Sequence, residues 1–431
     1  MAIPHTRSHA LIEQDRASIW HPFTQMHTAR TPIPIARAEG VYLFTEEGSR
    51  YVDAISSWWV NLHGHAHPYI VEKIHAQAAV LEHVIFADFT HRPAIELASR
   101  LLALLPGRFS KIFYSDNGST SVEVALKMAL QYWHNQNTPK NQIVCFKNSY
   151  HGDTFGAMSA AGKNAFNKPF WNHLFNVTCI DPPLPGHEKQ TLSQLQSLLN
   201  EEDVACFLFE PLILGVGGMI IYPAEGLNPL IRLCKARGVL TIADEVMTGF
   251  GRTGTLFACE QLKEECDLIC LSKGLTGGFL PLGVTACSQK IFNAFLSDHM
   301  QSAFLHGHSY TANPLACASA LASLDLLLKN ECYRQRKEIE ASHRAFCQKW
   351  HSHPKLKRCE NLGVILVLEY RVDTPSYFHS IRERLYSFFL SKGILLRPFG
   401  NVLHVLPPYC ISKEEVQAIY DHIIFTLEED I

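Results

Sequence analysis

Two side chains of opposite charge end two apolar stretches of the sequence. The stretch "VLTIADEV" places Asp244 after an apolar run, and "DLICLSKGLTGG" does the same for Lys273. Ligands of open α/β sheets bind beyond the carboxyl ends of such strands. We therefore expect an acid and an amine to face one crevice. They would either act together on a ligand or form a buried ion pair, and the two residues alone leave both hypotheses open.

A turn rich in glycine and hydroxyl groups follows another apolar stretch. In "YSDNGSTSVEVALKMALQYW", Gly118, Ser119 and Thr120 form the turn, and a helical pattern begins there. Thr120 and Glu123 have the spacing of a capping box. Free N–H groups at a helix start, with hydroxyls beside them, bind anions such as phosphate. By itself the pattern is also typical of a helix start that binds nothing.

Short apolar strands alternate with helical patterns from about residue 66 to 325. The clearest strands are "KIFYSD", "QIVCF", "ACFLFE", "VLTIADE" and "LICLSK". Most are apolar on both faces, as a parallel sheet covered by helices requires. We predict an α/β fold in which residues 66–325 form a large domain around a mainly parallel sheet.

Both ends of the chain have a different pattern. Near the N-terminus, "GVYLF" and "RYVDAIS" flank "TEEGS" and predict a hairpin. The C-terminal part predicts, in order, a long helical stretch around 315–350, a strand in "NLGVILVLEY", a helix near 377–392, and two strands around Gly400-Asn401. A closing helix begins at Ser412, with Glu415 completing a capping box. Residues 1–65 and 326–431 are therefore predicted to form one smaller α+β domain.

The composition of the 431 residues excludes several classes of protein. A net charge of −3 gives no field that would attract nucleic acid or an anionic membrane. No stretch is apolar enough to span a bilayer, and the first residues lack the layout of a signal peptide. The 13 cysteines are scattered without a CxxC pair, which favours buried free thiols over disulfides or structural zinc. We expect a cytoplasmic protein.

Six stretches together resemble the class III, fold-type I aminotransferases, which use pyridoxal 5′-phosphate (PLP). They are "SDNGSTSVEVALKMA", "YHGDTFGAMS", "EPLILGVGGM", "ADEVMTGFGRTG", "LICLSKGLTGG" and "HGHSYTANPLACASA", in the order of the family. The resemblance implies that Lys273 binds PLP covalently and that Asp244 pairs with the pyridine nitrogen. It also implies that Tyr150 and Val246 cover the two faces of the ring. A lysine away from water or near a cation loses its proton more readily and becomes a nucleophile and base.

The same resemblance assigns Gly118 and Ser119 to the phosphate of PLP. Ser309, in "HGHSYTANP", matches a residue that family members contribute to the phosphate site of the neighbouring subunit. We therefore expect a homodimer with shared active sites, small-molecule substrates and no metal.

Three further stretches resemble the biotin-pathway branch of this family. They are "IWHPFTQM", "SSWWVNLHG" and "LLRPFGNVLHVLPPY". Enzymes of that branch move an amino group to 8-amino-7-oxononanoate, usually from S-adenosylmethionine. The resemblance implies that Arg397 binds the carboxylate of the keto acid, that Trp58 lines the pocket for its aliphatic chain, and that Arg252 and Gly307 occupy substrate-site positions. Without the resemblance, Trp58 would be read as core and Arg397 as a surface residue.

Three positions depart from the pattern of the branch. Phe23 and His404 stand where tyrosines are usual on the surface that receives the amino donor, so a relative that takes its amino group from lysine is an alternative. Leu214 replaces a glutamine that is usually near the cofactor, and its loss would weaken contact with the ring hydroxyl.

Two other motifs suggest different chemistry. "GFGRTG" fits the dinucleotide fingerprint GxGxxG, but "DEVMT" separates it from the strand and no clear helix follows. "HGHAHP" places His63, His65 and His67 at alternate positions that could bind a metal if extended, although the resemblance favours a structural turn.

Other functions on the same fold remain as alternatives. They are an ω-amino-acid transaminase, a PLP-dependent lyase, decarboxylase or isomerase, and a relative that acts as a scaffold without catalysis. The stretches "SSWW" and "RPFG" argue against the first. The presence of Lys273, Asp244 and the phosphate turn argues against the last.

Overall fold

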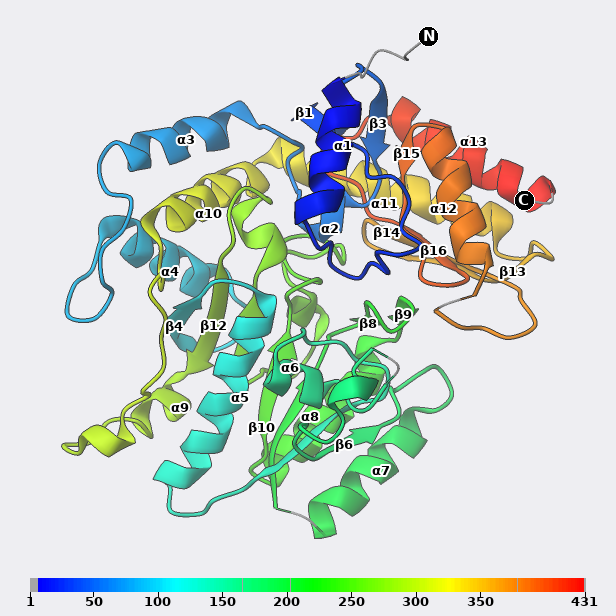
Figure 1. Cartoon of the computed structure of the whole chain (residues 1–431). Helices are drawn as coiled ribbons and strands as arrows, with labels where there is room; N and C mark the ends of the chain where they lie inside the picture. Colours follow the sequence, from blue (N-terminus) through cyan, green and yellow to red (C-terminus); the bar gives the residue numbers. More distant parts are fainter. Residues whose placement is uncertain (1–6, 165, 202, 378, 430–431) are drawn as a thin grey trace.

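A computed structural model of the chain describes residues 7–164, 166–201, 203–377 and 379–429. Its centre is a seven-stranded sheet in the order β4-β12-β11-β10-β7-β5-β6 (Figure 1). The strands are β4 (Phe109–Ser115), β5 (Gln142–Phe146), β6 (Val177–Ile180), β7 (Val204–Phe209), β10 (Leu240–Asp244), β11 (Leu268–Leu271) and β12 (Gly283–Ser288). All run parallel except β12, which is antiparallel to both of its neighbours. The predicted α/β class with a mainly parallel sheet is confirmed.

Alternate side chains of these strands fill two separate apolar layers. Ile143 and Leu208 pack with helix α5, whereas their neighbours Val144 and Phe207 belong to the layer on the other face of the sheet. This alternation explains why the strands read as apolar on both faces. The helices and short strands of this part are α3 (Pro68–Ala78), α4 (Arg92–Leu104), α5 (Gly118–Asn135), α6 (Phe155–Ala160), α7 (Glu188–Glu201), β8 (Ile213–Leu214), β9 (Ile220–Ile221), α8 (Ala224–Ala236), α9 (Gln289–Asn293) and α10 (Pro314–Leu327).

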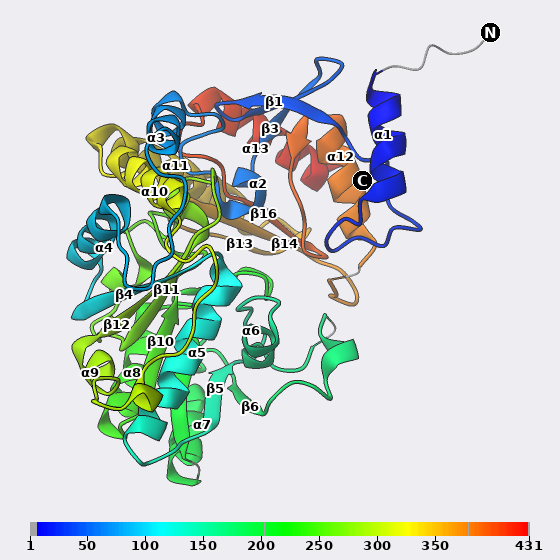
Figure 2. The same ribbon diagram turned by 60° about the vertical axis from the view of Figure 1, so that its left-hand side comes forward.

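The two ends of the chain come together above this sheet (Figures 1 and 2). They form the sheets β1-β2-β3-β15 and β13-β14-β16. The elements are α1 (Arg7–Ser18), β1 (Ile35–Glu39), β2 (Tyr42–Thr45), β3 (Arg50–Asp53), α2 (Ser56–Trp59), α11 (Asn330–Trp350), β13 (Leu356–Leu362), β14 (Ile365–Tyr370), α12 (Ile381–Ser391), β15 (Ile394–Leu395), β16 (Val402–Val405) and α13 (Lys413–Glu428). Because β15 pairs in parallel with β3, residues from both ends share one sheet. The domain limits at 66–325 stay a prediction.

Several predictions for the chain ends can be compared with these elements. The hairpin near the N-terminus is confirmed as the antiparallel pair β2–β3. The helical stretch around 315–350 is two helices, because α10 ends at Leu327 and α11 begins at Asn330. The two strands around Gly400-Asn401 exist, but β15 pairs with β3 and β16 pairs with β14.

The first residues of α5 are held differently from the predicted capping box. The cap is Asn117, whose side chain accepts from the Thr120 N–H at 3.0 Å, while Thr120 Oγ1 accepts from the Asn117 N–H at 3.0 Å. Glu123 instead accepts from the N–H groups of Gly156 and Ala157, at 2.6 and 3.1 Å. The prediction of a Thr120–Glu123 box was therefore wrong, because the glutamate ties α5 to the first turn of α6.

All cysteines are free thiols, and all but Cys179 and Cys410 are buried. This confirms the reading of buried thiols rather than disulfides. None of the helices in the described part of the chain has both the length and the apolar character needed to cross a membrane.

The predicted cap of the closing helix is confirmed and can be tested. Ser412 Oγ accepts from the Glu415 N–H at 3.1 Å, and Glu415 Oε2 accepts from the Ser412 N–H at 2.7 Å. We expect Ser412→Ala to weaken the first turn of α13 by about 1 kcal/mol, because backbone N–H groups lose their acceptor. Amide hydrogen exchange at the start of α13 should become about fivefold faster. Ser342→Ala is the matched control, since Ser342 lies inside helix α11 and does not cap α13. If the start of α13 exchanged equally fast in this control variant, the role of the cap would be contradicted.

Candidate active site

A cavity of about 730 Å³ opens at the carboxyl ends of β10 and β11. Eight of the residues predicted to form the cofactor and substrate sites lie in its wall: Trp58, Gly118, Ser119, Tyr150, Asp244, Val246, Lys273 and Arg397. They come from strand ends, from the start of α5 and from both ends of the chain. The cavity is thus built at the edge where a parallel sheet binds its ligands.

Lys273 follows the end of β11 and starts a single 3₁₀ turn, Lys273–Thr276. Its backbone has a φ of 45°, in the left-handed region that side chains rarely adopt, and Gly277 ends the turn with a φ of 65°. Such backbone strain persists only where the surrounding structure enforces it. The turn directs Lys273 Nζ over the ring of Trp59, 4.6 Å from its centre.

The electrostatic surroundings of Lys273 favour loss of its proton. Burial lowers the pKa of the amine from 10.5 to about 8, and the nearby Arg252 acts in the same direction. Asp244 and Glu210 oppose this shift because negative charge stabilises the ammonium. The amine can therefore be neutral near physiological pH, as a nucleophile or general base must be.

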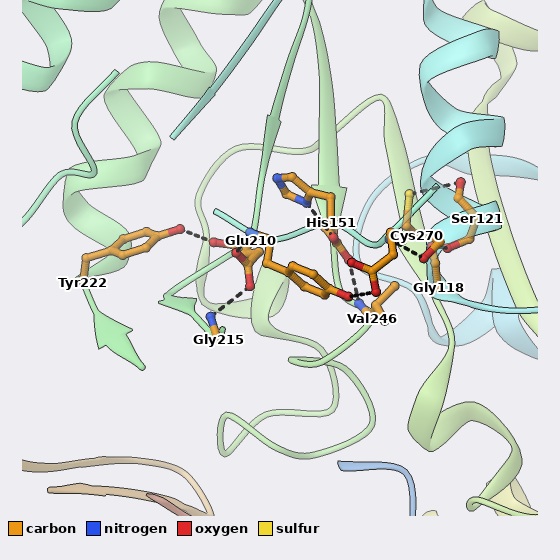
Figure 3. Close-up of polar contacts among 12 residues, drawn as sticks. Gly118, Ser121, His151, Glu210, Gly215, Tyr222, Val246 and Cys270 are labelled. Atoms are coloured by element: carbon orange, nitrogen blue, oxygen red, sulfur yellow. Dashed lines mark hydrogen bonds and ion pairs between the residues drawn. The ribbon is translucent and has the colours of Figure 1, made fainter. Parts of the chain in front are cut away.

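Asp244 is buried at the floor of the cavity and is held through both carboxylate oxygens. His151 Nδ1 lies 2.7 Å from Oδ2, and the Val246 N–H donates to Oδ1 at 3.1 Å (Figure 3). His151 Nε2 is also buried and has no hydrogen-bond partner among the described residues. A carboxylate oriented in this way can pair with a protonated nitrogen of a ligand in the cavity.

Glu210 fixes the loop that carries Tyr150. Its carboxylate accepts from the N–H groups of Tyr150 and Gly215, each at 2.9 Å, and its carbonyl accepts from Tyr222 Oη (Figure 3). Burial raises the pKa of Glu210 to about 7, with Asp244 acting in the same direction. The phenol of Tyr150 donates to Asp153 Oδ2 at 2.8 Å. The Tyr150 ring is therefore anchored at both its backbone and its hydroxyl.

The start of α5 forms the other side of the floor. The first N–H groups of a helix have no acceptor within the helix and attract anions. Space is tight here, because a Cβ on Gly118 would lie 2.7 Å from Val246 Cγ1. Ser119 Oγ accepts from the Asp153 N–H at 3.1 Å and stays at the cavity wall. An anionic group such as a phosphate fits at this position.

The upper wall of the cavity is aromatic and carries one guanidinium. Trp58 is 41% exposed, so it is not a core residue. Its ring lies 5.6 Å from that of Phe23 and 5.1 Å from Arg397 Cζ. Arg397 therefore faces the cavity rather than flanking a hairpin on the outer surface. An apolar chain that ends in a carboxylate matches this wall.

Three predicted site residues lie outside this cavity. Arg252 is buried behind it, where its guanidinium donates to the carbonyls of Trp59, Asn61 and Pro407. Gly307 and Ser309 are exposed and do not line it.

The departures from the family pattern lie at different depths. Phe23 is in the cavity wall. His404 is fully buried behind Trp59 and Phe399, so the expectation that it faces a donor was wrong. Leu214 is also fully buried, in the core around β8, and does not line the cavity. Its side chain serves packing at this position.

Several wall residues were not assigned from the sequence. Glu210, His151, Trp59 and Phe399 stand inside quoted motifs, and each motif is the signal that could have identified them. Phe166 and Tyr377, whose rings lie 4.7 Å apart, have no local motif. Only the folded chain brings these two side chains together.

The structure does not place the motifs "HGHAHP" and "GFGRTG" in the arrangements that metal binding or dinucleotide binding would need. His63 lies 3.1 Å from Ser323 Oγ, while His65 lies 2.9 Å from Asp53 Oδ2, so these rings face different partners. No group of side chains suited to a metal is found within the described ranges. After "GFGRTG" the chain forms only the short 3₁₀ turn Ala258–Gln261.

Comparisons with known proteins agree with this geometry. The family described as aminotransferase class-III matches residues 24–427. A Synechococcus elongatus protein named adenosylmethionine-8-amino-7-oxononanoate aminotransferase is 47% identical over 95% of this chain and 98% of its own. The crystal structure of the enzyme of that name from Methanocaldococcus jannaschii has a TM-score of 0.91 and 36% identity, covering 98% of this chain and 99% of that chain. An amine transaminase from an uncultivated Pseudomonas species, solved with PLP bound, has a TM-score of 0.88 and 28% identity, covering 95% and 98%.

The influence of Asp244 on Lys273 can be measured in protein without added ligand. Because Asp244 stabilises the ammonium, we expect Asp244→Asn to lower the pKa of Lys273 below about 8. The pH dependence of reductive methylation, followed at Lys273 by mass spectrometry, gives the midpoint. Asp181→Asn, which removes a carboxylate paired with Lys147, serves as the control. An unchanged or raised midpoint in Asp244→Asn would show that the two groups do not interact.

Proposed function

Because the chain belongs to the class III aminotransferase family, we propose that it converts 8-amino-7-oxononanoate to 7,8-diaminononanoate in biotin biosynthesis. S-adenosylmethionine is the proposed amino donor, as the names of its relatives state. One observation carries the choice of substrate: Arg397 and Trp58 share a cavity with Lys273 and Asp244. A guanidinium beside an aromatic wall suits an aliphatic keto acid.

PLP is the cofactor of this family, and the residues present fit it. Lys273 would bind it covalently, Asp244 would pair with its pyridine nitrogen, and Gly118 and Ser119 at the start of α5 would receive its phosphate. When bound, PLP supplies a ring that accepts the electron pair left when a proton leaves the carbon beside the amine. Asp244 would maintain this property, because its negative charge would favour a protonated pyridine nitrogen.

Lys273 carries the proton in both halves of a ping-pong reaction. Its lowered pKa, about 8, lets the neutral amine take a proton from the donor's carbon and, still within the first half, pass it to the carbon of the cofactor that would receive the amino group. In the second half the amine would take the proton back from that carbon and deliver it at carbon 7 of the keto acid. The ring of Trp59, centred 4.6 Å from the amine, shields one side of it from water and so helps to keep this pKa low.

Arg397 and the aromatic wall orient the keto acid. The guanidinium donates two parallel hydrogen bonds to the substrate carboxylate. The aliphatic chain lies against Trp58 and Phe23, whose rings exclude water from it. This places the carbonyl toward Lys273 and the carboxylate toward the cavity entrance.

A homodimer in the cytoplasm completes the proposal. Gly307 and Ser309 are exposed and lie outside the cavity of their own chain. In a dimer they would reach the neighbouring subunit's cavity, where Ser309 would donate to the phosphate and Gly307 would contact the substrate.

The reaction itself is the first test. Purified protein with PLP, S-adenosylmethionine and 8-amino-7-oxononanoate should form 7,8-diaminononanoate, detected by mass spectrometry. Lys273→Ala should abolish turnover while the circular dichroism stays unchanged, because no other amine replaces it at the reacting carbon. Retained transamination in Lys273→Ala would refute the assignment. Turnover with lysine and none with S-adenosylmethionine would correct the donor while leaving the acceptor in place.

The second test concerns Arg397. We expect Arg397→Ala to raise the KM for 8-amino-7-oxononanoate about 10- to 100-fold, since hydrogen bonds to a charged group contribute about 1.5–3 kcal/mol. The KM for the donor should change much less, which steady-state kinetics with each substrate varied in turn would show. Arg30→Ala, at a surface ion pair with Glu383, is the control. Equal losses for acceptor and donor would contradict this role.

A further inference from the structure

We propose that His404 is a positioning residue that holds the indole of Trp59 against the reacting amine, Lys273. The inference rests on the proposed function only in taking Lys273 as that amine. No part of His404 lines the cavity, so its effect must pass through Trp59.

The ring of His404 is enclosed between two aromatic residues of the cavity wall. His404 lies on β16, where it pairs with Val367 of β14, and it is 1% exposed. Its ring stacks on Phe399 with centres 4.9 Å apart and meets Trp59 edge-on at 5.7 Å. Phe399 and Trp59 also contact each other, at 5.9 Å. The three rings form one cluster, in which Trp59 and Phe399 line the cavity and His404 lies behind them.

The hydrogen bond between His404 and Trp59 has a defined direction. Trp59 Nε1 lies 3.1 Å from His404 Nε2, and an indole nitrogen can only donate. His404 Nε2 therefore accepts, and the proton of the neutral imidazole is on Nδ1. Burial lowers the pKa of His404 to about 3, so the ring keeps this acceptor throughout the working pH range.

The second ring nitrogen of His404, Nδ1, indicates that the residue does more than fill space in the core. His404 Nδ1 is buried and has no hydrogen-bond partner in the part of the chain that the structure describes. A buried polar group without a partner costs about 1–3 kcal/mol. An apolar side chain would avoid that cost, but it would leave the indole N–H of Trp59 without an acceptor.

Trp59 transmits the effect to Lys273. Its ring is 3% exposed, and its centre lies 4.6 Å from Lys273 Nζ. The backbone of Trp59 has a φ of 65°, so its position is strained and needs support. If the acceptor were lost, the indole would turn away from its place against Lys273, and the amine would be more exposed to the cavity. Since burial is the largest cause of the low pKa of Lys273, that pKa would rise.

The test compares a variant that keeps an acceptor with one that does not. His404→Gln can present an amide oxygen near the position of Nε2, whereas His404→Leu cannot accept a hydrogen bond. The readout is the pH midpoint of Lys273 methylation in protein without PLP. We expect His404→Leu to raise this midpoint by about one unit, and His404→Gln to leave it near that of the wild type. In the loaded enzyme, His404→Leu should lower kcat about tenfold while the KM for the keto acid stays within about twofold.

His343→Leu is the matched control. His343 is also a fully buried neutral histidine, bonded to Tyr420 Oη at 2.6 Å and to the Val364 carbonyl at 3.2 Å, and it does not line the cavity. This variant should lower stability without moving the midpoint of Lys273. If His404→Leu does not fold, Trp59→Phe removes the donor of the same bond together with part of the ring that covers Lys273, and it should raise the midpoint as well.

Three outcomes would overturn the proposal. They are a wild-type midpoint in folded His404→Leu and in Trp59→Phe, an equal rise in His404→Gln and His404→Leu, or an equal rise in His343→Leu. Failure of the proposed function is a separate result. Wild-type protein that does not aminate 8-amino-7-oxononanoate would refute that function, whereas the midpoints of Lys273 would still report on His404.

Discussion

Partial burial of one lysine amine at the cavity wall is the constraint on which the rest of the cavity depends. An ammonium in such a place is unstable, so the pKa of Lys273 falls to about 8. Three groups adjust this value: Asp244 and Glu210 raise it, whereas Arg252 lowers it. The strained backbone of Lys273, with its φ of 45°, is maintained by the packing around the turn. The surrounding protein thus holds Lys273 in a place that disfavours its charged form and in a backbone conformation that is itself unfavourable. Both features bear on the amine of this one residue.

The central sheet and the two chain ends contribute different residues to the cavity around this amine. The parallel sheet supplies the acid and the amine, because its strands end at one edge. The two chain ends supply the aromatic wall and Arg397, and they are joined by the parallel pairing of β3 with β15. Trp58 therefore sits on a segment far in sequence from Arg397, although the two side chains touch. The acid and amine of the floor and the aromatic residues and guanidinium of the wall are thus held by different parts of the fold.

Much of the fold and of the cavity floor could be predicted from the sequence, because both depend on local patterns. Apolar runs identify the central strands; Asp244 is the last residue of β10, and Lys273 lies two residues after the end of β11. The start of α5 shows the limit of local reasoning: Asn117 is as good a cap as Thr120, and Glu123 found partners in another helix. The depth of His404 could not be predicted, since only packing decides which residue of a wall faces inward.

The reversed strand β12 has a consequence for the mechanics of the cavity. Because it runs opposite to β11, the chain goes from Lys273 straight to the start of β12 at the same edge of the sheet, without crossing back through a helix. Gly278, Phe279 and Leu280 of this link lie in the cavity wall. Both ends of the link are fixed by neighbouring strands, and between them it forms the 3₁₀ turn Lys273–Thr276. Lys273 and part of the cavity wall are thus carried by one continuous segment between two paired strands, so a change in the conformation of this segment would alter the wall and the position of the amine together.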